Sequence, residues 1–418
     1  MACMTYRQAL EQVLYWLSPS ATEYVPIHEA DGRILAQDCY SQAEVPNADY
    51  SLRDGYALRS SELIGCSKEN PVSLGVVGHS AAGQRYDKKV QAGHCVRIMT
   101  GAVIPDELDA VVAYEEVAIN AGDGSVGSII SYGWPIKAGS YIRHKGQDAQ
   151  PGDLILKQGS QLDPAAIGAL GAAGLREVLV YCKPRVAIIP LGNELVALDD
   201  EPKSGQVRNS NLLALCAYAN QAGGQALPYY IVHDEPFELS HAINECSTQA
   251  DLVVIVGGSS KGDFDFADTS LRNSGQLIYS ELALRPGQSQ GFGLVNSTPV
   301  FSLPGVPHAA FLSFELMVRP AIRKAAGFKH VERLRLPVRL AHDIPKVEKH
   351  PDDSYYIPVK LRLAADAVFE AWQVDKQQQS ALLSGAHGCQ GILEISPGLD
   401  RAKAGSTVSC LLLDEQLN

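Results

Sequence analysis

The sequence has no apolar run that approaches the ~20 residues required by a membrane-spanning helix. Its N-terminus, MACMTYRQALEQVLYWLSPS, lacks the basic start and long apolar stretch of a secretory signal peptide. The nine cysteines form no C-x-x-C pair and no Cys/His cluster at ligand spacing, which favours reduced thiols over disulfides or structural zinc. We therefore expect a cytoplasmic protein that does not enter the membrane.

Basic stripes, internal repeats and low-complexity tracts are absent as well. A net charge of -12 argues against generic binding to nucleic acid or to an anionic membrane surface, although it allows local basic pockets. Hydrophobic residues make up 46% and charged residues 20% of the chain, which is ordinary for globular proteins. A length of 418 residues is too great for one core and predicts two to four domains.

The pattern of expected elements changes along the chain. Short strands and Gly-rich turns come first, followed by a helix that Asp163 caps and Pro164 begins. From Lys183, strands and helices alternate, which is the signature of a doubly wound α/β domain with a parallel sheet. After about Arg333, β-branched residues and turns predict a small β-barrel or sandwich. The expected α/β elements are strands at 185–192, 225–232 and 251–258, helices at 209–224, 236–250 and 267–275, a strand pair around 296–297, and a helix at 307–326.

Three Gly-containing turns are expected at the carboxyl ends of α/β strands: PLGNEL at 190–195, VGGSSKGDFDF at 256–266, and SLPGVPHA at 302–309. Open parallel sheets bind ligands at these ends, where the strand order reverses. Glycine lets the backbone approach a ligand closely, and Pro307 at a helix start leaves backbone amides available to an anion. The turns therefore predict a ligand that carries phosphate.

Carboxylates follow three of these strands, at Glu194, Asp234 and Asp265, so that one cleft can collect them. Carboxylates and phosphates repel each other unless a cation lies between them, and Mg²⁺ prefers such oxygen ligands. We predict that the glycines and serines of the turns receive phosphate and that an aspartate holds Mg²⁺. Taken singly, a Gly-Gly turn is usually only structural, and an aspartate such as Asp268 can be a helix cap. The prediction rests on the set as a whole.

Eight motifs that occur in order along the chain carry a resemblance to a known family. They are SLRDGYAL (51–58), VRIMTGAVIPDELDAVV (96–112), RHKGQD (143–148), GNEL (192–195), GQVRNSN (205–211), GGSSKGDFD (257–265), RPGQ (285–288) and LPGVP (303–307). Through them, essentially the whole chain resembles the molybdopterin molybdenumtransferase family, the MoeA-like proteins that include the C-terminal part of gephyrin.

This resemblance implies a multidomain α/β plus β fold in an elongated subunit that forms a homodimer. The implied parts are a discontinuous N-terminal linker or dimerisation domain (1–46 and 141–181), an inserted β-rich domain with the DGYA and TGA motifs (47–140), a molybdopterin-binding α/β domain (182–328), and a small C-terminal β-barrel (332–418). The site would lie between the α/β domain of one subunit and the inserted domain of its partner.

The reaction that the resemblance implies inserts molybdenum from molybdate into adenylylated molybdopterin, with Mg²⁺, and releases AMP. Molybdate and tungstate are not distinguished by the sequence, and other proteins of molybdenum cofactor biosynthesis are further candidate partners. Glu194 and Asp265 are the implied metal ligands, while Asp54 and Thr100 would act on the oxyanion across the dimer interface. The full implied catalytic set is Asp54, Thr100, Glu194, Asp234 and Asp265. The implied substrate-binding set is Gly192, Asn193, Gly257, Gly258, Ser259, Ser260, Lys261, Arg285, Gln288, Pro304, Gly305 and Pro307.

The chain departs from the family pattern at Arg53, Asn193, Lys261, Gln288 and Val306. The first four changes together make the expected cleft about two charges more positive, and a tenfold change in binding needs only ~1.4 kcal/mol. Two hypotheses therefore stand. The chain is an insertion enzyme with a reshaped pocket, or it is a paralogue that binds molybdopterin or a partner protein without inserting metal.

Overall fold

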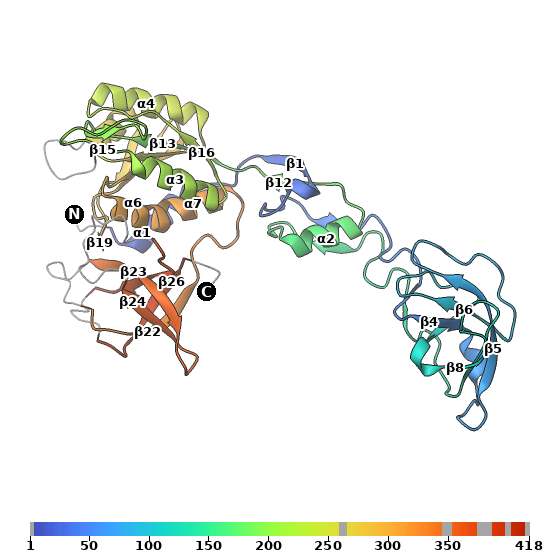
Figure 1. Cartoon of the computed structure of the whole chain (residues 1–418). Coiled ribbons are helices and arrows are strands. Elements are labelled where there is room, and N and C mark those ends of the chain that lie inside the picture. The colour runs from blue at the N-terminus through green and yellow to red at the C-terminus, as the bar shows by residue number, and fades with distance from the viewer. Residues whose placement is uncertain (1–3, 259–265, 345–352, 374–386, 398–402, 414–418) are drawn as a thin grey trace.

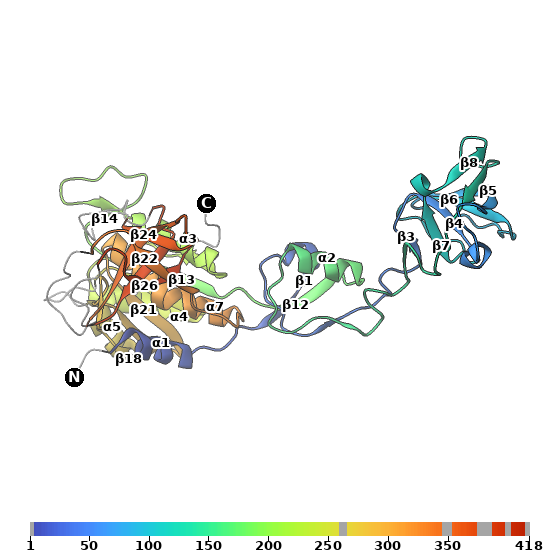
Figure 2. The same cartoon turned by 90° about the horizontal axis from the view of Figure 1, so that it is seen from below.

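The computed structural model describes residues 4–258, 266–344, 353–373, 387–397 and 403–413. These residues form an elongated subunit, as the family resemblance implies, with an α/β body and a β-barrel together at one end (Figure 1). A small body of β1, β12 and α2 lies in the middle, and a β-rich body lies at the opposite end (Figure 2). Within the described ranges, no helix combines the length and apolar character needed to cross a bilayer.

The β-rich body at the far end, which we call the distal body, is one six-stranded sheet with order β7-β4-β6-β5-β9-β8. Its strands are β4 (Gly55–Leu58), β5 (Val72–Ser80), β6 (His94–Ile98), β7 (Ala110–Ala113), β8 (Ala118–Ala121) and β9 (Ile129–Tyr132). All four residues of β4 are buried between β6 and β7, and the sheet packs a core that includes Tyr56, Leu74, Val112 and Ile130. This core is large enough to hold the turns at either end of β4 in place.

The chain passes twice through the middle body, which contains two short antiparallel pairs. They join β1 (Thr22–Pro26) to β12 (Glu177–Tyr181) and β2 (Cys39–Tyr40) to β11 (Leu154–Leu156). A third pair, β3 (Tyr50–Ser51) with β10 (Ile142–Arg143), lies against the distal body, where the amide of Ser51 donates to the carbonyl of Ala102. Helix α2 (Pro164–Ala172) begins as the sequence predicts, because the Asp163 carboxylate accepts the amide of Ala166 at 2.7 Å. The helix and the β1–β12 pair share a core that includes Leu170 and Val180.

The α/β body contains a six-stranded sheet with order β16-β13-β17-β21-β20-β18. Its strands are β13 (Arg185–Pro190), β16 (Gln225–Pro228), β17 (Leu252–Val256), β18 (Gln276–Tyr279), β20 (Gly291–Val295) and β21 (Thr298–Leu303). The first four strands in this order are parallel, and Ile188 of β13 lies opposite Val254 of β17. β20 runs antiparallel to both β21 and β18, so the sheet is mixed: the predicted parallel sheet forms its first four strands, and the strand pair predicted around 296–297 is the β20–β21 hairpin. The reason is the tight hairpin at Asn296 and Ser297, both with positive φ, which can join only antiparallel strands.

Helices cover both faces of this sheet, which confirms the doubly wound prediction. On one face, Ile188 and Val254 pack against helix α3 (Ser210–Gln221), the helix from Pro307 to Ala325 and helix α1 (Tyr6–Tyr15). On the other face, Ile189 and Ile255 pack against α4 (Pro236–Gln249) and α5 (Phe266–Ser274). Helix α1 therefore packs with the α/β body, although its residues fall within the range 1–46 that the sequence assigned to the linker domain.

The helix expected at 307–326 runs as α6 (Pro307–Ser313), a π-helical turn (Phe314–Val318) and α7 (Arg319–Ala325). Pro320 has no N–H to donate one turn back, and the amide of Arg319 instead reaches the carbonyl of Phe314, five residues earlier. The strand expected at 225–232 ends at Pro228, which has no N–H to donate to the neighbouring strand. Beyond it, the amide of Tyr229 still donates to the carbonyl of Ile188 at 2.9 Å, and Val232 forms a bridge with Leu191.

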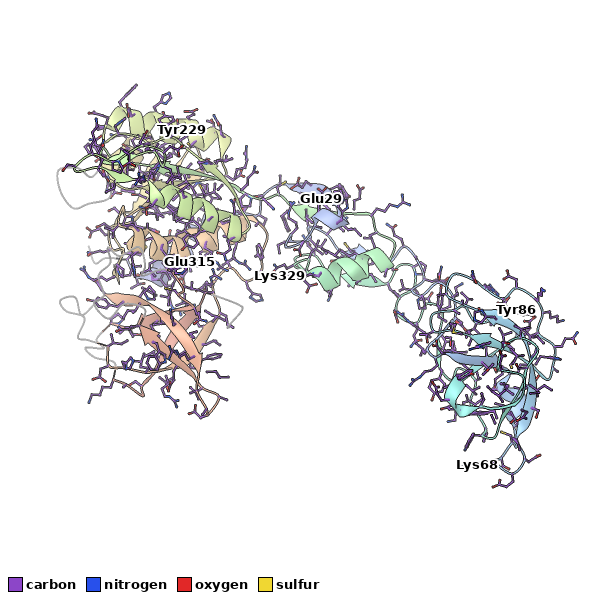
Figure 3. All side chains as sticks on the ribbon, viewed as in Figure 1. Glu29, Lys68, Tyr86, Tyr229, Glu315 and Lys329 are labelled. Carbon is purple, nitrogen blue, oxygen red and sulfur yellow. The ribbon has the colours of Figure 1, made fainter. Side chains whose placement is uncertain are left out.

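The C-terminal strands close into a barrel, which settles the alternative of barrel or sandwich. They are β22 (Arg335–Leu340), β23 (Ser354–Leu363), β24 (Phe369–Gln373), β25 (Gly391–Ile395) and β26 (Thr407–Leu412), and β19 (Leu284–Arg285) adds to β23 at one edge. Glu315, on the π-helical turn, joins the barrel to the α/β body (Figure 3) because its carboxylate accepts from Nε of Arg333 at 3.0 Å. Tyr356, Ile392 and Leu411 of the barrel extend the core of the α/β body.

Candidate functional site

The strand order of the α/β sheet reverses between β13 and β17, because the chain leaves β13 for β16 on one side and returns to β17 on the other. Ligands of doubly wound sheets bind in the crevice beyond the carboxyl ends of such strands. The turns after β13 and β17 are two of the three that the sequence singled out, and the third follows β21, the neighbour of β17. The topology therefore brings the three turns together.

Close backbone contact between these turns requires glycine. Gly257 has a φ of +110°, and a Cβ at this position would lie 2.1 Å from the carbonyl oxygen of Leu191. The amide of Gly257 donates to the carbonyl of Leu303 at 3.1 Å, and the amide of Leu191 donates to the carbonyl of Val256 at 2.9 Å. The ends of β13, β17 and β21 are thus tied together by main-chain contacts rather than by side chains.

Asn193 and Asp234 are paired by two hydrogen bonds. The Asn193 amide donates to a carboxylate oxygen of Asp234 at 3.2 Å, and the Asp234 amide donates to the side-chain oxygen of Asn193 at 3.1 Å. The amide of Gly192 also donates to the carbonyl of Val232 at 3.1 Å. Asp234 therefore holds the turn that carries Glu194, and one of its oxygens is already engaged.

Glu194 lines a cavity of about 510 Å³ at this point. The Glu194 carboxylate lies directly beside Gly192 in the same turn. A side chain on Gly192 would collide with it, because its Cβ would lie 2.4 Å from a Glu194 oxygen. Gly257, Gly305 and Pro307, for which the resemblance implies a role in substrate binding, line the same cavity, and Arg208 supplies a cationic side chain. The volume lies within the usual range of about 300–1,000 Å³ for small-molecule pockets.

Asn209, Ser210 and Asn211 also line the cavity, although they are not among the site residues predicted from the sequence. Asn209 caps α3 by accepting the amide of Leu212 at 3.3 Å, and Asn211 donates from its side chain to the carbonyl of Gly305 at 2.8 Å. The sequence signal for these residues is the GQVRNSN motif, which belongs to the family resemblance but carries no predicted role. Asn211 ties α3 to the proline-rich turn after β21.

Other predicted site residues lie elsewhere or outside the described ranges. Ser259, Ser260, Lys261 and Asp265 fall within the undescribed segment 259–265, and Gly258, with a φ of +64°, is the last described residue before it. Pro304 is buried, and Val306 is the exposed residue that precedes α6.

Arg285 and Gln288 have intramolecular partners in the structure. Arg285 donates from Nε to the Asp353 carboxylate at 2.7 Å, an ion pair between β19 and the barrel. The carbonyl of Gln288 accepts the amide of Leu282 at 3.0 Å. Neither residue is among those that line the 510 Å³ cavity, so their predicted contact with substrate stays a prediction.

Asp54 and Thr100 form a compact polar pair on the distal body. One oxygen of the Asp54 carboxylate accepts both the amide of Thr100, at 2.7 Å, and its hydroxyl, at 2.8 Å. These two hydrogen bonds stabilise the ionised form and lower the pKa of Asp54 below its usual value, the amide contributing most. Both residues are exposed, and the nearby Arg53 guanidinium lies 5.5 Å from the ring of Tyr141.

The pair and the cavity lie at opposite ends of the subunit. Asp54 precedes β4 and Thr100 follows β6 in the distal body, whereas the cavity lies beyond β13 and β17 in the α/β body (Figure 2). A single copy of the chain therefore does not bring Asp54 and Thr100 to Glu194. Among the residues that the structure describes, no three His, Cys, Asp or Glu side chains cluster as a metal site.

Comparisons with known proteins find relatives that match most of the chain. Residues 4–174 match the MoeA N-terminal region (domain I and II), and residues 187–324 match a probable molybdopterin binding domain. The molybdopterin molybdenumtransferase of Haemophilus influenzae is 34% identical over 78% of this chain and 78% of its own length. That of Bacillus subtilis is 31% identical over 98% and 94%. The crystal structure of a molybdopterin biosynthesis MoeA protein from Pyrococcus horikoshii superposes with a TM-score of 0.81 at 29% identity, and covers 99% of this chain and all of that one.

Proposed function

The chain belongs to the molybdopterin molybdenumtransferase family, and from this premise we propose that it inserts molybdenum from molybdate into adenylylated molybdopterin, with Mg²⁺, and releases AMP. The observation that carries the proposal is the 510 Å³ cavity at the reversal of strand order, where main-chain turns, Glu194 and Arg208 converge. Phosphate suits the Arg208 guanidinium and the close backbone at Gly257.

The oxygen donors around the cavity suit Mg²⁺ when the ion is bound together with a phosphate-bearing substrate. Mg²⁺ is commonly held by one or two carboxylates while water and substrate phosphates complete its octahedral shell. Glu194 is a carboxylate that lines the cavity, and Asp265 is the second candidate, in the undescribed segment. When bound, the ion would neutralise charge on the phosphoanhydride that is cleaved.

We further propose that two copies of the chain build each site. Asp54 and Thr100 of one copy would complete the cavity of the other, because they lie at the opposite end of their own subunit. In this role the low pKa of Asp54 keeps its carboxylate ionised. The Thr100 hydroxyl donates to that carboxylate, and this hydrogen bond fixes the orientation of the hydroxyl. Because an ionised carboxylate repels an oxyanion unless a cation lies between them, the pair would position the oxyanion through a bridging cation rather than act as a nucleophile.

The experiment is the release of AMP from adenylylated molybdopterin by the purified protein with Mg²⁺, in parallel reactions with molybdate, tungstate or no oxyanion. Release that depends on an oxyanion supports the proposal and identifies the anion preferred. A Glu194→Ala variant should lose release, whereas Glu201→Ala, in the exposed ion pair with Arg208, should keep most of it. Release without oxyanion dependence, or full activity in Glu194→Ala, would contradict the proposed role of the cavity.

A second candidate is a protein that binds molybdopterin without inserting metal. It is favoured by the Asn193–Asp234 pair, because the main-chain amide of Asn193 donates to an oxygen of Asp234 that a metal would otherwise use, and the side chain of Asn193 brings no negative charge. This candidate predicts tight binding of molybdopterin with no AMP formed under any oxyanion. Formation of AMP in the reaction above excludes it.

A further inference from the structure

The turn that carries Asp54 on the distal body is held in place by hydrogen bonds. The amide of Leu52 donates to the carbonyl of Tyr141 at 2.8 Å. The buried hydroxyl of Ser51 donates to the carbonyl of Arg53 at 2.6 Å and accepts the amide of Arg53 at 3.3 Å. The backbone at Arg53 is therefore fixed directly beside Asp54.

The Asp54–Thr100 pair uses its own hydrogen-bond donors. The amide and the hydroxyl of Thr100 both donate to one oxygen of the Asp54 carboxylate. An ionised carboxylate has only acceptors, and a hydroxyl has a single hydrogen to donate. The next amide, that of Gly101, donates to the carbonyl of Ser51 at 2.8 Å. None of these described groups therefore has a hydrogen left for an oxyanion, although Asp54 and Thr100 are exposed.

Arg53 has the donors that the pair lacks. Its guanidinium is always charged and carries five N–H groups in a planar fork, which suits an anion with several oxygens. The side chain is exposed, and the guanidinium carbon lies 5.5 Å from the centroid of the Tyr141 ring, in a cation–π contact. Among the residues that the structure describes, no carboxylate lies within ion-pairing distance of Arg53. Its charge is therefore not offset by an ion pair within the described chain.

The surface beside the pair has room for an anion. Gly101 is exposed, and a Cβ at this position would meet no atom within 4 Å. Consecutive Cα atoms are about 3.8 Å apart, so the long side chain of Arg53 starts next to Asp54 and can reach the space in front of it. A guanidinium and an oxyanion form short, charge-assisted hydrogen bonds, often two in parallel.

We propose that Arg53 is the residue of the distal body that binds the oxyanion, a tetrahedral dianion of the molybdate type, by donating from its guanidinium to the anion oxygens. The inference rests on the proposed function and adds to it the group that receives the anion. Arg53 supplies a cation without which the Asp54 carboxylate repels the oxyanion. The family resemblance assigns no role to Arg53, where the chain departs from the family pattern.

Two variants of Arg53 and one control test this role. Arg53→Met keeps an unbranched side chain but removes the charge, and Arg53→Lys keeps the charge but removes the planar fork. Lys68→Met is the matched control, because Lys68 is also exposed on the distal body and its ammonium lies 5.3 Å from the centroid of the Trp134 ring (Figure 3). The control therefore removes a cation of the same body that is in the same kind of contact.

Two measurements are made on the full-length protein: the KM for molybdate in AMP release, and the Kd for molybdate alone by titration calorimetry. We expect Arg53→Met to raise both by roughly tenfold or more, Arg53→Lys to raise them less, and Lys68→Met to leave them unchanged. The KM for adenylylated molybdopterin should stay at the wild-type value in all three variants. Melting temperatures should agree with the wild type, because Arg53 and Lys68 are exposed, which excludes misfolding as the cause.

The results that overturn this inference are distinct from those that overturn the proposed function. Equal values for molybdate in Arg53→Met and Lys68→Met remove the role of Arg53 while AMP release by the wild type leaves the proposed function intact. A rise in the KM for adenylylated molybdopterin alone assigns Arg53 to that substrate and also overturns the inference. If the wild type releases no AMP, the proposed function fails, and the calorimetric Kd for molybdate then decides the role of Arg53 by itself.

Discussion

At the scale of single residues, the hydrogen bonds between Asp54 and Thr100 define the polar pair of the distal body. Because the pKa of Asp54 is lowered in the folded state, the pair stabilises the protein above the unfolded pKa of the carboxyl. That stabilisation is lost as the pH falls through the lower, folded pKa. The Asp54 carboxylate therefore remains ionised at neutral pH.

Replacement of Thr100 by valine removes the hydroxyl donor but keeps the backbone amide. We expect the pKa of Asp54 to rise part of the way toward its usual value, since one of the two hydrogen bonds that lower it is lost. Titration of the Asp54 carboxyl carbon by NMR measures this shift. Thr100→Ser, which keeps a hydroxyl, should leave the pKa low, and an unchanged pKa in Thr100→Val would show that the hydroxyl does not contribute.

At the scale of the elements, the turns after β13, β17 and β21 depend on the absence of side chains at the point of contact. Gly257→Ala would place a methyl group 2.1 Å from the carbonyl oxygen of Leu191 at a φ of +110°, so the turn after β13 must move. We expect the 510 Å³ cavity to be distorted and the Kd for adenylylated molybdopterin to rise by roughly tenfold or more.

The control for this variant is Gly205→Ala. Gly205 also has a positive φ, of +84°, but a Cβ there meets no atom within 4 Å, so that only the backbone cost of roughly 1–2 kcal/mol applies. We expect Gly205→Ala to bind ligand nearly as the wild type does. Equal loss of binding in both variants would mean that the close contact at Gly257 is not what shapes the cavity.

Glu315 connects the long helix of the α/β body to the barrel. It is 5% exposed and lies 3.0 Å from Nε of Arg333 and 3.8 Å from Nε of Arg319. Glu315→Ala removes the carboxylate from the buried Arg319 and the partly buried Arg333, and we expect a loss of about 3 kcal/mol in the free energy of unfolding. Scanning calorimetry measures the loss, and Glu201→Ala, which breaks an exposed pair, should change stability little.

The sequence predicted the elements of the α/β body well where local patterns decide the structure. Helix α3 follows its cap at Asn209, and strand β17 is a short, fully buried apolar run. The sequence indicated the strand pair around 296–297, but it did not indicate that β18 adds to this pair, nor did it predict the π-helical turn before Pro320, because both depend on tertiary packing. The role of Asn211 was also missed, because its partner Gly305 lies 94 positions away in the sequence.

At the scale of the whole molecule, the two parts of the proposed site lie at opposite ends of an elongated subunit (Figure 2). The family resemblance indicates both the Asp54–Thr100 pair and the turn with Glu194. No local sequence pattern, however, indicates the distance between these two parts of the site in one copy of the chain. Their separation leads to the central claim that each site combines Glu194 of one copy with Asp54 of another. Variants at these two positions should therefore complement each other.

The most direct test of this claim is AMP release by a mixture of two separately inactive variants, Asp54→Ala and Glu194→Ala. After subunit exchange at equal amounts, half of the dimers are mixed, and each mixed dimer has one intact site, so roughly a quarter of the wild-type activity should return. A mixture of Glu194→Ala with Asp234→Ala, both in the α/β body, should remain inactive. Activity of the first mixture no greater than that of its separate variants would contradict a site shared between two copies.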